Sequence, residues 1–121
     1  MDKKKDHCEL LDLFNLLGKK WTIEILHNIN DKPISFNQLY VFFGHKISPI
    51  LLSKRLKELE NFSFINRKEI DKRIIYIISS RGKEVKKNIN MTRKWLIRKR
   101  YKVPAECKKE DQCLRCIQRP D

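Results

Sequence analysis

The sequence predicts a mainly helical α+β fold in which a small β-hairpin precedes the last helix. Three observations predict it. Apolar residues recur at helical spacing through residues 10–59, the period changes to that of strands after Asn61, and a long basic helical pattern follows Ser79. A chain of 121 residues is most simply one folded domain, which we place at residues 1–100, followed by a cysteine-rich tail at residues 101–121.

Two helices are expected first. Leucines and a phenylalanine cluster on one side of residues 10–17, and Gly18 is a natural residue after a helix end. A second helix is expected from about Lys20 to Asn28, because Trp21, Ile25, Leu26 and Ile29 can then face inward. The Asn-Asp-Lys-Pro sequence that follows predicts a turn.

The next two helices are separated by a short connection. Ser35 and Gln38 form a capping-box pattern that opens a third helix, which Gly44 ends. Ser48 is a second N-cap, with Pro49 at the first helical position, where a missing N–H costs nothing. In this fourth helix the spacing predicts one buried stripe and one outer face, made respectively of Leu52, Leu56 and Leu59 and of Ile50, Ser53, Lys54 and Lys57.

A hairpin and a last helix complete the pattern. Residues 64–70 and 73–79 are rich in Ile, Phe and Tyr, and Asp71-Lys72 lies between them. Ser79 or Ser80 then caps a long helix, which we expect Pro104 to end. From Arg81 to Lys102 the chain has ten basic residues and one acidic residue.

Charge and hydropathy restrict the function. A formal charge of +13 attracts polyanions, of which nucleic acid is the commonest, although a solvated lysine-rich surface is an alternative. No apolar window is long enough to span a membrane, and no cleavage site follows the first leucines, so we expect a cytoplasmic protein without a signal peptide. Without a phosphate loop, a nucleophile beside a base or paired carboxylates, we do not expect an enzyme.

A tight helix–turn–helix followed by a two-stranded ribbon is the winged helix-turn-helix arrangement, in which one helix enters the major groove of double-stranded DNA. We expect the start of the fourth helix to bind DNA, with Ser48 at its cap, and we expect the bases to be read by Pro49, Ile50, Ser53 and Lys54. Basic residues farther along should meet phosphates, namely Lys57, Arg67, Lys72 and Arg73. Individually, each lysine could equally be a solvated charge.

Several motifs resemble those of the HxlR-type transcriptional regulators, winged-helix relatives of the MarR group. They are Gly18, Lys19 and Trp21 with Lys20 inserted, Phe36 to Leu39, Ile47-Ser48, Leu56 to Glu60, and Tyr76 to Gly82. The resemblance covers roughly residues 8–97. The chain departs from the family at Ser63, where glycine is usual, at Ser79, where threonine is usual, and in a short wing.

The resemblance implies a homodimer in which the first and last helices of both subunits pack together. The sequence agrees, because it offers more apolar surface on these helices than a small domain easily covers: Leu10, Phe14, Leu17, Ile89, Trp95 and Leu96. The alternative is that all of these residues are buried within one subunit.

Four cysteines leave three interpretations open. Cys107, Cys113 and Cys116 have the spacing of a partial zinc or iron–sulfur site, which Cys8 could complete, or His7 in its place. Alternatively the thiols are redox-active, with Cys8 oxidised or bridged to the tail. Cys8 matches the position at which HxlR-type proteins commonly carry a sensing cysteine, although Glu9 replaces the usual proline. Thirdly, they are reduced thiols or a structural disulfide.

The sequence therefore predicts a dimeric, sequence-specific, DNA-binding regulator that responds to cysteine chemistry or to a bound metal. The rivals are a non-specific architectural DNA-binding protein, which would bind unrelated duplexes alike, and a winged helix used as a protein-interaction module, which would bind little DNA.

Overall fold

The structure is a computed structural model, and it describes residues 8–103. Its elements in chain order are α1 (Glu9–Leu17), α2 (Thr22–His27), β1 (Ile34–Ser35), α3 (Phe36–Phe42), α4 (Pro49–Asn61), β2 (Ile65–Ile70), β3 (Arg73–Ile78) and α5 (Ser80–Arg98). The predicted fold class of helices with a β-hairpin before the last helix is confirmed. No helix among the described residues is long and apolar enough to cross a membrane.

Three helices begin at the serines that the sequence indicated. The Ser35 hydroxyl accepts from the Gln38 amide, and the Gln38 side chain accepts from the Ser35 amide, which completes the predicted capping box. Ser48 caps α4 by accepting from the Leu51 amide at 3.1 Å, with Pro49 at the first turn. Ser79 caps α5 in the same way.

Two helices end in Schellman turns that have no glycine. After α4, the amides of Ser63 and Phe64 donate to the carbonyls of Glu60 and Leu59, and Ser63 has φ 65°. After α5, Arg100 takes this left-handed place with φ 63°. The last helix therefore ends at Arg98, well before Pro104, where we expected it to end, because the Arg100 turn has already satisfied its final carbonyls.

The second helix is shorter than predicted, since it begins at Thr22 and not near Lys20. Trp21 precedes it in a left-handed conformation with φ 80°, and the Thr22 amide donates to the Lys19 carbonyl at 3.2 Å. Trp21 is nevertheless buried, and its ring meets that of Phe43 edge-on at 5.6 Å between centroids.

The sheet has three antiparallel strands in the order β1-β3-β2. Asp71 and Lys72 both have positive φ, as a two-residue type I′ turn requires, and Ile70 pairs with Arg73 across it. The sequence did not reveal β1, in which Ile34 pairs with Tyr76, because two residues are too few to show an alternating pattern.

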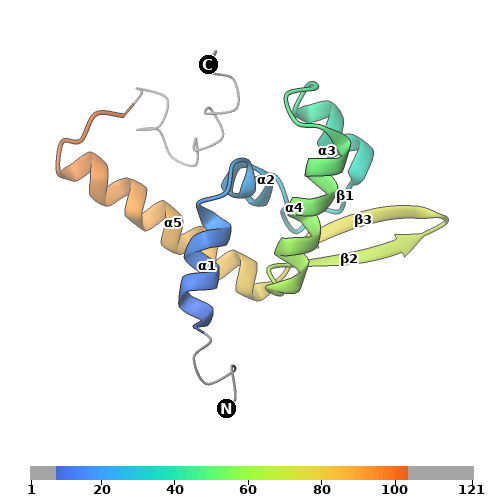
Figure 1. Cartoon of the computed structure of the whole chain (residues 1–121), viewed down its shortest axis with the longest axis horizontal. Coiled ribbons are helices and arrows are strands. Elements are labelled where there is room, and N and C mark those ends of the chain that lie inside the picture. Colours follow the sequence, from blue (N-terminus) through green and yellow to red (C-terminus); the bar gives the residue numbers. More distant parts are fainter. Residues whose placement is uncertain (1–7, 104–121) are drawn as a thin grey trace.

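The core lies where α2, α3 and α4 meet the base of the hairpin. Its fully buried hydrophobic members come mainly from these helices and the residues that follow them: Ile25, Leu26, Ile29, Leu39, Phe43, Ile47, Leu52, Leu56, Leu59 and Ile65. In Figure 1, α4 and the hairpin occupy one side of the molecule, and α1 and the outer part of α5 occupy the other. The fold therefore presents two separate surfaces.

Candidate nucleic-acid interface

The outer face of α4 is exposed along its length. Because its three leucines are at most 1% exposed, the opposite side of the helix faces solvent. This side carries the predicted base-reading and phosphate-binding residues, all of them exposed: Ser48, Pro49, Ile50, Ser53, Lys54 and Lys57. Ile50 is 82% exposed, which is unusual for a large aliphatic residue and leaves it able to contact a thymine methyl group.

The basic hairpin lies beside α4 (Figure 1). Arg67, Lys72 and Arg73, which the sequence indicated as phosphate ligands, are exposed there. Lys68 is also exposed, and sequence reasoning missed it, although its place in the basic strand Ile65–Ile70 is the same signal that indicated Arg67. Burial raises the pKa of Tyr76, and the neighbouring Arg67 opposes that rise.

Ion pairs hold α4 against the segment that follows α1. Glu58 accepts from Lys19 Nζ at 2.6 Å and from Arg55 Nη1 at 3.1 Å, and Arg55 Nε donates to the Lys20 carbonyl at 3.0 Å. Burial acts to raise the pKa of Glu58, but the hydrogen bonds and charges of Lys19 and Arg55 outweigh it and hold that pKa below its usual value. Arg55 therefore braces the helix, while Lys54 and Lys57 face solvent.

Lys86 fastens α5 to the end of α2. Its ammonium donates to the Ile29 carbonyl at 2.5 Å and to Asn30 Oδ1 at 2.9 Å, where a helix C-terminus favours positive charge. Burial lowers the pKa of Lys86 to about 8, against the opposing effect of Asp31. Burial likewise lowers the pKa of His27, whose Nδ1 lies 2.9 Å from the Ile23 carbonyl oxygen, so His27 packs as an ordinary helix residue.

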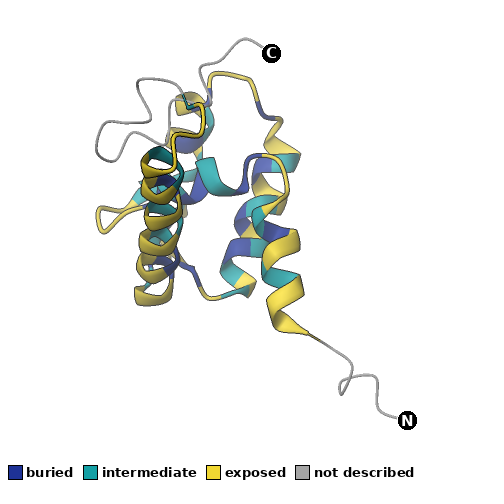
Figure 2. Cartoon of the chain, turned by 90° about the vertical axis from the view of Figure 1, so that its left-hand side faces the viewer, coloured by how far each residue is buried: buried dark blue, intermediate teal, exposed yellow. Residues whose placement is uncertain are grey.

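The second surface, on α1 and α5, is apolar. Leu10, Phe14 and Trp95 of the predicted dimer interface are 57%, 58% and 43% exposed, and Leu96 is partly exposed. Leu17 and Ile89 instead pack against the core of their own chain. Figure 2 shows that the start of α1 is exposed.

Sequence reasoning missed further exposed apolar residues on this surface, namely Leu11, Met91 and Tyr101. Met91 lies four residues before Trp95, a spacing that could have indicated it. Tyr101 packs beside Trp95 through the turn at Arg100, with 5.8 Å between ring centroids, and the sequence gives no signal for that turn.

Cys8 is exposed and lies at the N-cap of α1, without a capping hydrogen bond from its side chain. Cys107, Cys113 and Cys116 lie outside the described residues, so the predicted metal or redox set stays a prediction. Among residues 8–103, no group of three His, Cys, Asp or Glu side chains is arranged to hold a metal ion. In both views the start of α1 lies toward the bottom and the described chain ends toward the top (Figures 1 and 2).

Comparison with known proteins identifies the fold family. The model of the HxlR-like helix-turn-helix family matches residues 16–103. The chain belongs to this family. The predicted resemblance is thus confirmed, and the winged helix-turn-helix fold with it.

Relatives of this HxlR-like protein are named as transcriptional regulators. A regulator of Methanocaldococcus jannaschii is 34% identical over 98 residues, which are 78% of this chain and 89% of the relative. YodB of Bacillus subtilis, an HTH-type transcriptional regulator, is 35% identical over 72 residues. That match covers 57% of this chain and spans 63% of the length of YodB.

Solved structures of YodB have the same fold as this HxlR-like chain. The reduced form superposes with a TM-score of 0.66 at 28% identity and covers 74% of this chain and 91% of YodB. The quinone-bound form gives the same TM-score and identity, over 76% of this chain and 99% of YodB. The diamide-treated form gives a TM-score of 0.61 at 26% identity, over 81% of this chain and 98% of YodB.

Proposed function

We propose that this protein is a dimeric, sequence-specific, DNA-binding transcriptional regulator that is gated by cysteine chemistry at Cys8. The observation that carries the proposal is the exposed face of α4 beside a basic hairpin, in a chain of the HxlR-like helix-turn-helix family. In this proposal the protein acts in the cytoplasm and by binding alone, without catalysing a reaction.

The exposed side chains have two proposed roles in DNA binding, namely base contact and phosphate contact. Ser48, Pro49, Ile50, Ser53 and Lys54 lie on the first two turns of α4 or at its cap, from which a recognition helix contacts base edges. Lys57, Arg67, Lys72 and Arg73 lie on the outer face of α4 or on the hairpin, and would neutralise phosphates of the same duplex. The formal charge of +13 increases the rate of encounter but does not select a sequence.

The apolar surface of α1 and α5 supports the dimer. Exposed leucine and aromatic side chains gathered on adjacent elements are typical of a protein interface. Two copies joined there by a twofold axis would place two α4 helices on one duplex, and the interface geometry would set the spacing of the half-sites.

Cys8 is the proposed point of control. It begins α1, two residues before Leu10, so a covalent change at its sulfur would disturb the start of the proposed dimer helix. The YodB structures supply the precedent, since that regulator has been captured in reduced, quinone-bound and diamide-treated forms. Diamide takes two electrons from a pair of thiols, which lose their protons and join as a disulfide, while diamide becomes the hydrazine.

A zinc ion or iron–sulfur cluster on Cys107, Cys113, Cys116 and Cys8 is the other form that this control could take. The thiolate chemistry suits either group. Metal analysis of anaerobically purified protein separates the two forms: stoichiometric zinc or iron supports the metal site, and metal-free protein with a full diamide response contradicts it.

The test of the proposed function is DNA binding by anaerobically purified protein. Fluorescence anisotropy would compare the duplex from upstream of its own gene with a shuffled duplex, before and after diamide. We expect tight binding to the upstream duplex alone, and a change in its affinity on oxidation. In Cys8→Ser that change should disappear while the reduced affinity stays the same.

Other outcomes identify the rivals. Equal affinity for both duplexes with a steep salt dependence would indicate an architectural DNA-binding protein. Little affinity for either duplex would indicate a protein-interaction module. A Cys8→Ser variant that still responds to diamide would remove Cys8 from the mechanism and leave DNA binding in place.

A further inference from the structure

A groove of about 550 Å³ lies between the last turn of α5 and the segment that follows it. Small-molecule sites in proteins have volumes of roughly 300–1,000 Å³, so this groove has the size for a compound of one or two rings. The end of α5 lies on the side of the molecule away from α4 and the hairpin (Figure 1). The lining of the groove consists of Ile97, Arg98, Arg100, Tyr101, Lys102 and Val103.

The turn at Arg100 gives the groove a defined shape. The Tyr101 amide donates to the Leu96 carbonyl at 3.1 Å, and Arg100 has φ 63°. This left-handed residue turns the chain back toward the helix. Tyr101 consequently lies beside Trp95, with 5.8 Å between the ring centroids. A capped helix end and a ring contact therefore hold the segment that forms one side of the groove.

The lining carries three positive charges and no negative one. Arg98, Arg100 and Lys102 are exposed, and none of them has a carboxylate partner among residues 8–103. The sequence from 85 to 103 contains no Asp or Glu that could serve as one. The negative end of the α5 dipole accounts for Arg98 in the last turn, but Arg100 and Lys102 follow the end of the helix. The groove therefore favours an anionic ligand.

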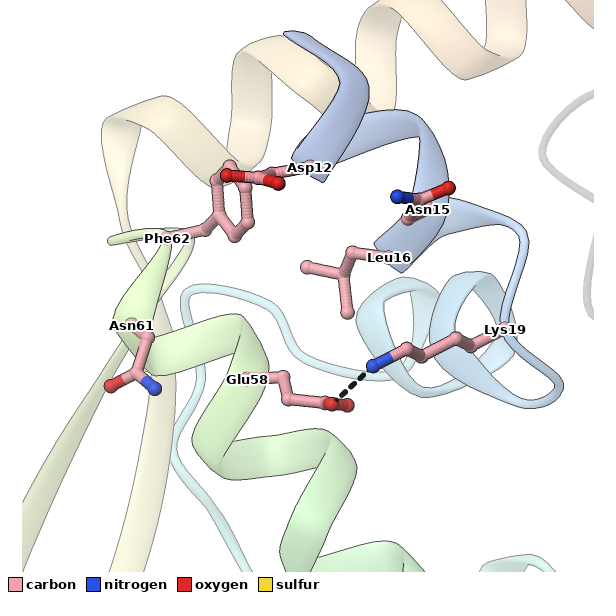
Figure 3. Close-up of a pocket in the computed structure, with 7 residues that line it drawn as sticks. All are labelled: Asp12, Asn15, Leu16, Lys19, Glu58, Asn61 and Phe62. Carbon is pink, nitrogen blue, oxygen red and sulfur yellow. Dashed lines mark hydrogen bonds and ion pairs between the residues drawn. The ribbon is translucent and has the colours of Figure 1, made fainter. Parts of the chain in front are cut away.

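Other lysines of the chain differ in this respect. The Lys19 ammonium lies 2.6 Å from the Glu58 carboxylate, in a second concave part of the surface (Figure 3). Lys83, near the start of α5, lies 2.7 Å from Asp31 Oδ1. The fold itself neutralises these two lysines, whereas it supplies no anion to the groove at the end of α5 from the described residues. A bound ligand would supply that anion.

The chemistry of the lining indicates phosphate groups together with a planar ring. An arginine guanidinium presents a planar fork of N–H donors that matches the oxygens of a phosphate, and a lysine adds a further positive charge. Ile97 and Val103 are apolar and partly buried, and Tyr101 is 55% exposed, so this part of the groove can pack against a ring. A nucleoside diphosphate has both parts, a base and two phosphate groups.

We propose that the groove at the end of α5 binds a nucleoside diphosphate, with its phosphates on the three cations and its base against the apolar residues. The backbone of a nucleic acid offers the same phosphate chemistry, so the test distinguishes a free nucleotide from a nucleic acid. The site does not rest on the proposed function, because its binding is measured on the protein without DNA.

The first experiment titrates the full chain with ADP, in the presence of a thiol reductant and of a chelator that removes magnesium. Heteronuclear NMR should show saturable shifts for the Ile97 and Val103 methyl groups and for the Arg100 amide. Adenosine and pyrophosphate each keep one part of the ligand, and we expect each to bind at least about tenfold more weakly than ADP. The absence of shifts at these groups at about 5 mM ADP would overturn the site. Equal binding of adenosine or of pyrophosphate would overturn the ligand class.

Variants locate the bound ADP. Arg100→Gly removes the guanidinium and keeps the turn, because glycine adopts positive φ without strain. Lys102→Gln removes a second charge, and each variant should weaken ADP binding by about fivefold or more. Lys87→Gln is the matched control, since Lys87 is exposed on the same helix outside the groove, and it should bind ADP as the wild type does. Equal weakening in all three variants would show that ADP responds to net charge alone, which would overturn the assignment to the groove.

The second experiment identifies the source of the phosphate by competition. Equilibrium dialysis would measure bound ADP with and without the upstream duplex, and with and without a single-stranded oligodeoxynucleotide, each at the same concentration of phosphate groups. We expect ADP to stay bound in every case. Displacement by either nucleic acid would assign the groove to a nucleic-acid backbone and overturn the free nucleotide as its ligand. A protein that binds ADP but shows no specific DNA binding would refute the proposed function and leave this site in place.

Discussion

Helices α1 and α4 share one pattern of burial, but their exposed faces differ in chemistry. Each buries one face against the core and exposes the other. The exposed face of α4 is polar and basic, with Ser53, Lys54 and Lys57, whereas that of α1 is apolar, with Leu10 and Phe14. Helical periodicity alone cannot separate these two cases. The chemistry of the outer face indicates the partner, which is a polyanion for α4 and another apolar surface for α1.

The two helices also differ in how firmly the domain holds them. Leu52, Leu56 and Leu59 fix α4 in the core, whereas Leu16 is the one residue of α1 that is buried among those described. A helix with so little burial gains little stability from its own chain. The remaining stability of α1 should come from a partner, as the proposed dimer requires.

The largest expected effect is at Gly82, near the start of α5, where this helix packs against the base of the hairpin. A Cβ added at Gly82 would overlap the Phe64 carbonyl oxygen and come within 2.6 Å of Ile78 Cδ1. We expect Gly82→Ala to lower the free energy of unfolding by about 2–4 kcal/mol, because backbone atoms cannot give way. Urea unfolding measures it.

Gly44→Ala is the control for that prediction. Gly44 has φ 56° with open space around it, so the substitution should cost only about 1 kcal/mol of backbone strain. Equal losses in the two variants would show that contact with the hairpin base does not explain the need for Gly82.

The second prediction concerns the proposed dimer interface on the apolar face of α1. Phe14→Asp should leave the monomer folded, because Phe14 is 58% exposed, but should dissociate the proposed dimer by placing a charge in its interface. Affinity for a two-site duplex should fall by about tenfold or more as the second half-site is lost. Light scattering would give the mass and anisotropy the affinity.

Val41→Asp is matched to this change, since Val41 is 73% exposed on α3. The Val41→Asp protein should still have the mass of the proposed dimer. A Phe14→Asp protein that keeps the mass of the wild type would contradict the interface on α1.

A third prediction concerns the basic side. Lys54→Ala should lower the preference for the upstream duplex over a shuffled one by about 1–3 kcal/mol, because Lys54 of α4 is one of the proposed base-reading residues. Lys72→Ala, at the hairpin turn, should weaken both duplexes alike and reduce the slope of log K against log salt by about 1. Equal effects of the two variants on both duplexes would refute this division between base reading and phosphate binding.

Much of this fold could be predicted because local chemistry decides it. Ser35, Ser48 and Ser79 begin helices through side chains within three residues, and the leucines of α4 repeat at a fixed spacing. The strand β1 and the turn at Arg100 could not be predicted, because each depends on contacts that the rest of the fold supplies. The Lys19–Glu58 ion pair could not be predicted for the same reason, since its two residues are 39 positions apart in the sequence and meet only in the folded chain.

A fourth prediction uses the turn that follows α4. Ser63 has φ 65°, a conformation that costs an L-residue about 1 kcal/mol and glycine almost nothing. We expect Ser63→Gly to raise the free energy of unfolding by up to about 1 kcal/mol, less a few tenths for the greater freedom of glycine in the unfolded chain. Thermal unfolding measures it. A lower melting temperature would show that the Ser63 side chain makes a stabilising contact that outweighs its backbone strain.

The smallest effect concerns the ion pairs of Glu58, which hold α4 against the segment after α1, and it is tested through its pH dependence. The pKa of Glu58 is lowered in the fold, because Lys19 and Arg55 outweigh the opposing effect of burial. In the unfolded chain the pKa of Glu58 is near 4.5, so the unfolded state takes up a proton first as the pH falls. The stabilisation is complete above that value and is lost as the pH falls through the lower pKa of the folded state.

Glu58→Gln keeps the shape of the side chain and removes this charge. At pH 7 we expect it to lower the free energy of unfolding by less than about 1 kcal/mol, because the pair lies near the surface, with Lys19 42% exposed. The gap between wild type and variant should close in acid, and Glu69→Gln on the hairpin controls for the loss of one negative charge. A gap that stays constant from pH 7 to acid would mean that Glu58 holds α4 through packing alone, so the ion pair could not transmit a change at α1 to the recognition helix.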